Sequence, residues 1–106
     1  MAKIHFYLKN PNAQESLIVK QLNFKGKRHR TTIGEMIEVK AWDKRFERPR
    51  RGYDYRKWEP LSRKLDEIED EFTREYRALS YDNRVTPELV ERLFHQGEVK
   101  DAINLP

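Results

Sequence analysis

The sequence contains no cysteine, which excludes disulfide bonds and any chemistry that needs a thiolate. No apolar run approaches the roughly 18–20 residues that span a bilayer, and the N-terminus lacks the apolar segment of a signal peptide. The four glycines are isolated, so the sequence has no Gly-rich phosphate-binding loop. These absences fit a reducing cytosol and predict no contact with a membrane.

Residue patterns typical of catalysis are also missing. His5, His29 and His95 are scattered and show no metal-ligand spacing. No Gly-x-Ser-x-Gly elbow is present, and the acidic residues of the central region have no histidine three or four positions away. We therefore predict no catalytic residue, no metal, no cofactor and no small-molecule substrate, and we expect that this chain is not an enzyme by itself.

The charge that is present is divided unevenly between the two halves of the chain. Charged residues make up 38% of the 106 positions, against about 25% in an average globular protein. Residues 1–58 carry 15 Lys and Arg against 6 Asp and Glu, whereas residues 59–106 carry 7 against 12. A basic half beside an acidic half makes nucleic acid the first partner to test.

Alternation of apolar and polar residues predicts three strands in the basic half, within residues 2–34. The predicted strands cover residues 2–9, 17–24 and 28–33. Lys25-Gly26-Lys27 forms a tight connection, because Gly26 is free to adopt a positive φ. Lys20 interrupts the apolar face of the second strand, so we expect it near the sheet edge with its ammonium group reaching water.

The opposite face of this sheet gathers side chains that can read base edges and hold phosphates. Its members are His5, Tyr7, Gln21, Asn23, Arg28, Arg30 and Thr32. Water alone would also select a polar outer face on a one-layer sheet. The hairpin favours an anionic ligand, since Lys25, Lys27, Arg28 and Arg30 place four cations within six residues and no acid among them.

Residues 35–58 read as a basic connector that Pro49 and Gly52 keep from being regular helix. We expect Trp42 to anchor it to the core. The connector is either a solvated loop or an arm that follows a nucleic-acid backbone. The cations that follow Trp42 in it are Lys44, Arg45, Arg48, Arg50, Arg51, Arg56 and Lys57.

The acidic half predicts two helices. An apolar stripe indicates a long helix over residues 59–79, with Pro60 in its first turn, that covers the apolar face of the sheet. Thr86 as N-cap and Pro87 at the first position start a short helix, for which Gly97 supplies a stop. This helix either packs on the domain or begins a connection. The predicted fold class is α+β: a three-stranded antiparallel sheet covered by one long helix, plus a short C-terminal helix.

The order of several short motifs resembles one family over nearly the whole chain. The motifs are Ile4-His5-Phe6-Tyr7-Leu8-Lys9, Phe24-Lys25-Gly26-Lys27-Arg28, Ile33-Gly34-Glu35, Val39-Lys40-Ala41-Trp42-Asp43, Leu65-Asp66-Glu67-Ile68-Glu69 and Thr86-Pro87-Glu88. As a set they resemble the N-terminal arm-type DNA-binding region of tyrosine recombinases, the integrases of phages and mobile elements. The resemblance implies a DNA-binding domain over residues 1–82. Residues 83–106 would then hold a short helix and the start of a linker to a core-binding and catalytic region.

The resemblance also implies roles for particular residues and partners. The groove-facing set would be Tyr7, Gln21, Asn23, Arg28, Arg30 and Thr32. The phosphate contacts would be Lys25 and Lys27, joined by electrostatic capture through Lys44, Arg45, Arg48, Arg50 and Arg51. The implied partners are double-stranded DNA at arm-type sites and other integrase subunits, in a cytoplasmic protein associated with the nucleoid. Two positions depart from the family pattern, because Lys20 and His29 stand where its members usually carry apolar residues.

The family's catalytic residues belong to a different domain, and no His-x-x-Arg occurs in this sequence. Three other functions stay open on the residues alone: a protein-interaction module that uses the acidic helix, an RNA-binding module, and a small nuclease. Salt dependence separates the first from DNA binding, because phosphate contacts release counterions and protein pairing releases few.

Overall fold

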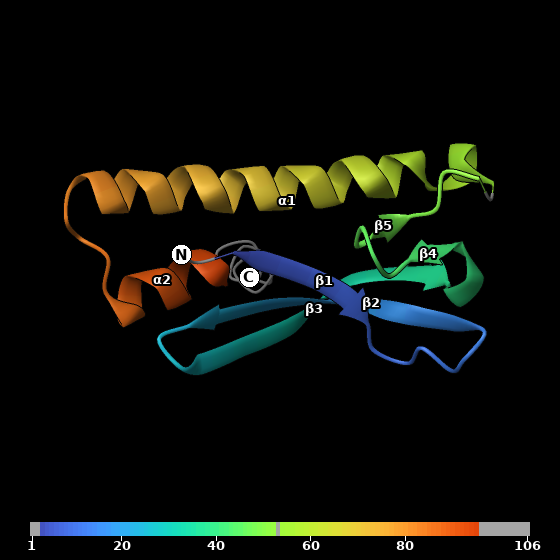
Figure 1. Cartoon of the computed structure of the whole chain (residues 1–106), viewed down its shortest axis with the longest axis horizontal. Coiled ribbons are helices and arrows are strands. Elements are labelled where there is room, and N and C mark those ends of the chain that lie inside the picture. Colours follow the sequence, from blue (N-terminus) through green and yellow to red (C-terminus); the bar gives the residue numbers. More distant parts are fainter. Residues whose placement is uncertain (1–2, 53, 96–106) are drawn as a thin grey trace, which may run out of the picture.

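The computed structural model describes residues 3–52 and 54–95, which form an α+β fold (Figure 1). One face of a three-stranded antiparallel sheet is covered by a long helix, and a short second helix lies below the C-terminal end of that helix. The predicted fold class is therefore confirmed. The elements are β1 (Ile4–Leu8), β2 (Glu15–Phe24), β3 (Lys27–Glu38), a 3-10 turn η1 (Val39–Ala41), β4 (Trp42–Asp43), β5 (Arg48–Pro49), α1 (Tyr55–Tyr81) and α2 (Pro87–Phe94).

The predicted tight connection between the second and third strands is confirmed. Phe24 pairs with Lys27, so only Lys25 and Gly26 form the turn. Both adopt positive φ, 49° and 78°. Two consecutive positive φ values define the type I′ turn, whose twist matches the right-handed twist of the strands that it joins.

The third strand is longer than predicted. The sequence prediction ended it at Ile33 because it treated Gly34 as a terminator. In the structure β3 continues to Glu38, through a register shift that lies between the Val19–Thr32 and Leu17–Met36 pairs. Gly34, with φ 79°, lies in this irregular stretch, where glycine accommodates the extra residues of a bulge instead of ending the strand.

The long helix begins four residues earlier than predicted, at Tyr55 in place of position 59, and ends at Tyr81. Pro60 lies inside the helix and not in its first turn. Because a proline lacks the N–H that would bond to the preceding turn, a local pattern favours it in the first turn, whereas here the helix continues through it. The predicted apolar stripe is otherwise correct: Leu61, Leu65 and Phe72 are buried in the core.

The core lies between the sheet and the two helices. It is formed by Ile4, Phe6, Leu8, Ile18, Leu22, Phe24, Ile37, Ala41, Trp42, Leu61, Leu65, Phe72, Val90 and Phe94. Trp42, 4% exposed, is the expected anchor of the connector. The connector itself is partly regular, since β4 and β5 pair as a small antiparallel hairpin that contacts α1.

The second helix packs on the domain. Thr86 is its N-cap, as predicted, because its Oγ1 accepts a 3.3 Å hydrogen bond from the Leu89 amide. Val90 and Phe94 are fully buried, which settles the open question in favour of packing. The predicted stop at Gly97 lies outside the described residues.

Candidate nucleic-acid interface

The strand register brings the predicted reading residues onto one face of the sheet. His5 lies opposite Gln21, which lies opposite Arg30. Tyr7 and Thr32 flank Val19 in the same way, and Asn23 pairs with Arg28. Directly paired residues of antiparallel strands point to the same side. We call this surface the open face, formed by His5, Tyr7, Val19, Gln21, Asn23, Arg28, Arg30 and Thr32.

No described helix packs on the open face, and Glu47 reaches only its edge at His5. Both helices lie on the opposite side of the sheet, so within the described residues no helix covers it (Figure 1). Asn23, Arg28 and Arg30 are exposed, and Tyr7 and Thr32 are half-buried. A shallow hollow of about 290 Å³ is lined by Tyr7, Lys9, Val19, Arg30, Thr31 and Thr32. The face can therefore accept a ligand without any rearrangement of the fold.

A pair of lysines stands at the end of the sheet, where Lys27 starts from the covered side because it pairs with the core residue Phe24. Lys25 and Lys27, which we call the turn group, flank Gly26 at the tip of the β2–β3 hairpin, and both are exposed. Lys25 Nζ lies 5.6 Å from the centre of the Phe24 ring. Lys27 Nζ lies 4.0 Å from Glu91 Oε1, at the limit of an ion pair between two exposed side chains. Such a pair is weak, so both cations can be offered to a phosphate.

A second basic group lies at the other end of the molecule, in and beside the β4–β5 hairpin. The Asp43 carboxylate accepts hydrogen bonds from the amides of Arg45 and Phe46, which closes the turn. Lys44 and Arg45 on this turn are exposed, as are Arg50 and Arg51 beyond it. We call these four the hairpin group. Figure 1 places it beside the N-terminal end of α1, whereas the turn group lies at the opposite end.

Arg48 differs from the rest of the predicted phosphate contacts. Its Nε donates to Asp66 at 2.9 Å and its Nη2 donates to Glu69 at 2.5 Å, and only 19% of its side chain is exposed. Burial would lower the pKa of Arg48, but the hydrogen bonds and charges of Glu69 and Asp66 outweigh that effect and raise it. The guanidinium joins β5 to α1 and is already neutralised.

Glu47 occupies part of the predicted polar face at its edge. Its carboxylate contacts His5 Nδ1 at 3.0 Å and accepts a 3.2 Å hydrogen bond from the Phe6 amide. Strand β1 is an edge strand, and an exposed edge is a template for unwanted pairing. Glu47 therefore protects this edge, and His5 is held by a carboxylate.

The expectation for Lys20 is wrong. Strand β2 is the central strand, so Lys20 is far from a sheet edge, and it is buried at 9% exposure. Its Nζ donates a 2.6 Å hydrogen bond to the Phe94 carbonyl and lies 4.6 Å from the centre of the Phe94 ring. The ammonium group meets the C-terminal end of α2, where a helix carries partial negative charge.

The prediction that no histidine has a metal-ligand spacing overlooked α2. Glu91 and His95 stand four residues apart, which places them on one face of the helix. The fold brings His29 of β3 to the same place, and the three residues offer ligand atoms within 4.8 Å of one another. The helical spacing was visible in the sequence, whereas the approach of His29 was not, because it depends on how α2 packs.

A cleft lies between β1, the β4–β5 hairpin and α1. It has a volume of about 900 Å³ and is lined by Lys3, His5, Asp43, Arg45, Phe46, Glu47, Arg48, Pro49, Arg51, Tyr55, Ser62, Asp66 and Glu69. Acids and bases alternate around it, so its charges cancel in a way that the charges of the turn group do not.

Neither described helix combines the length and the apolar character required to cross a membrane. No protein-family model matches the chain, and no significant match was found among curated proteins or among solved structures. The resemblance to tyrosine recombinases therefore stays a prediction.

Proposed function

We propose that this chain binds double-stranded DNA, with the open face in the major groove, as the N-terminal domain of an integrase of the tyrosine recombinase class. The observation that supports this most is the register. It aligns hydrogen-bonding and cationic side chains on one uncovered face beside the turn group. Three strands about 4.8 Å apart are about 10 Å across, which suits a major groove about 12 Å wide.

The side chains of the open face match the chemistry of base edges. Arg28 and Arg30 are suited to the paired acceptors of guanine, and Gln21 and Asn23 to the donor and acceptor of adenine. Lys25 and Lys27 would hold the backbone phosphates at the end of the face, which fixes position without reading sequence. Arg48 has no part in this proposal, because Asp66 and Glu69 already neutralise it.

The assignment to an integrase rests on the resemblance of the sequence motifs. In such a protein a small domain on an arm-type site would tether the catalytic part and raise its effective concentration at the site of strand exchange. The tether needs only moderate affinity, because the second binding event becomes intramolecular.

The test is a fluorescence-anisotropy titration of a labelled random 20-base-pair duplex, repeated across salt concentrations. We expect micromolar binding and, for about five phosphate contacts, a log–log salt slope near −4 to −5. Duplex RNA should compete poorly, because its deep, narrow major groove excludes the sheet.

A matched pair of variants tests whether DNA is bound by the turn group or by cations of α1. Replacing Lys25 and Lys27 with glutamine should weaken binding and flatten the salt slope by about 2. Replacing Arg74 and Arg77, which are exposed on α1, removes the same charge from the helical side and should change the slope little. If neither protein nor variant binds DNA at low salt, the proposal fails and the search moves to protein partners of α1.

A further inference from the structure

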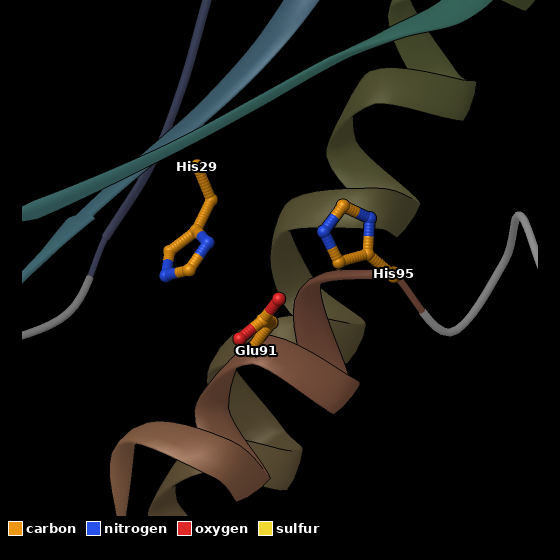
Figure 2. Close-up of side chains that lie close together, drawn as sticks. All are labelled: His29, Glu91 and His95. Carbon is orange, nitrogen blue, oxygen red and sulfur yellow. The ribbon is translucent and has the colours of Figure 1, made fainter.

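Three side chains with metal-binding chemistry converge between β3 and α2. Figure 2 shows the His29 ring directed from the strand toward the Glu91 carboxylate, with the His95 ring beside them at the end of the helix. One ligand atom from each lies within 4.8 Å of the others. His29 is buried at 8% exposure and His95 is half-buried, so the group is shielded on the sheet side and accessible from the helix side.

The position of the three residues is fixed by the packing of α2 and by the strand pairing of β3. Val90 and Phe94 bury α2 in the core, and Lys20 holds the Phe94 carbonyl. His29 is paired with Leu22 on the central strand, which directs it to the same side of the sheet as the core. A site that is prearranged in this way loses little conformational entropy when it binds an ion.

The donor set selects one class of ion. Two imidazole nitrogens and one carboxylate oxygen form the His₂Glu combination that holds Zn²⁺ with a fourth position open to water, and imidazole also suits Co²⁺ and Ni²⁺. Mg²⁺ and Ca²⁺ prefer oxygen ligands alone. Ligand bonds of 2.0–2.2 Å place tetrahedral donors about 3.4 Å apart, so small rotamer changes close the group around an ion.

Glu91 and the two histidine rings make long contacts with their neighbours and with each other. Lys27 approaches Glu91 at 4.0 Å, with both side chains largely exposed. The His29 and His95 rings meet edge to face with centroids 6.4 Å apart, and His95 meets Phe94 at 4.9 Å.

We propose that His29, Glu91 and His95 bind one divalent transition-metal ion of the zinc class, which joins α2 to β3 beside the turn group. The ion ties the last described helix to the strand that carries Arg28 and Arg30. It also displaces Lys27 from Glu91. The site lies on the covered side of the sheet and, apart from Lys27, involves no residue of the proposed DNA contacts.

The experiment uses the full chain, stripped of metal with a chelator and then titrated with ZnCl₂ or CoCl₂. We expect one ion per chain, visible absorption bands of tetrahedral Co²⁺, and a rise in Tm of about 10 °C at a zinc concentration 100 times the dissociation constant. MgCl₂ at the same concentration should leave the Tm unchanged. A wild-type chain that binds neither Zn²⁺ nor Co²⁺ at micromolar concentration would overturn the proposal.

Variants locate the ion. His95→Ala, Glu91→Gln and His29→Gln should each weaken Zn²⁺ binding at least tenfold, while the controls His5→Ala and Glu88→Gln should bind as the wild type does. His95 and Glu91 are not buried, so their variants should fold, and circular dichroism of the metal-free proteins checks this. Equal binding by all five variants would assign the ion to an adventitious surface site and contradict the proposal.

Discussion

Two segments carry similar positive charge in the sequence, yet the fold treats them differently. In residues 25–30 the side chains of Lys25, Arg28 and Arg30 point to water beside the open face. In residues 44–51, Arg48 forms ion pairs with Asp66 and Glu69. Asp43 and Glu47 lie among the other cations of this segment. The charge available to a ligand therefore depends on which acids the topology brings near the cations, and not on the number of cations.

Arg30→Ala should have the largest effect, and it tests whether the open face reads bases. Arg30→Ala should cost about 1–3 kcal/mol on a preferred site, selected from a random pool, because it removes a contact to a base edge. On unselected DNA the loss of binding free energy should be smaller, so the difference in affinity between the preferred site and random DNA should decrease. Anisotropy titrations of both duplexes measure this, and an equal loss on both would show that Arg30 does not read bases.

Arg48→Ala tests whether the ion pairs of Arg48 with Asp66 and Glu69 stabilise the fold. The substitution leaves two carboxylates of α1 without their cation and should lower the free energy of unfolding by about 1–2 kcal/mol. Urea unfolding followed by circular dichroism measures the loss. Arg45→Ala removes the same charge from an exposed position and should stay within about 0.5 kcal/mol of the wild type. Equal stability of both variants would contradict the structural role.

Lys25→Gln probes the turn group with a smaller change. Loss of one phosphate contact should flatten the log–log salt slope by about 1 and weaken binding to all sequences alike. Glutamine keeps the length of the side chain and places no new charge at the turn. A sequence-dependent loss in the anisotropy assay would move Lys25 from phosphate contact to base contact.

Arg50→Ala should have the smallest effect. Its side chain is exposed and belongs to the hairpin group, away from the open face, so binding to every duplex should weaken equally and by less than for Lys25→Gln. The same salt series measures it. A greater loss than for Lys25→Gln would reverse the ranking of the two basic ends.

Much of the fold follows from local patterns. Alternation predicted the strands and the members of the open face, the apolar stripe predicted α1, and Thr86-Pro87 marked the start of α2, because each signal lies within a few residues. The errors in the bounds of the elements arose at Gly34 and Pro60, because these residue types usually end or begin an element and here lie inside one. The pairing of Arg48 and the approach of His29 to α2 depend on residues at least 18 positions away, so no local pattern contains them.

The length of α1 has a consequence for the spacing of the two basic ends. A helix of 27 residues is about 40 Å long, which nearly equals the 43 Å longest dimension of the described molecule. The hairpin group lies beside one end of this helix and the turn group lies toward the other (Figure 1). One turn of B-DNA measures about 34–36 Å. The helix is therefore a rigid strut that keeps the two cationic groups at opposite ends of the molecule, and its length is comparable with one turn of B-DNA.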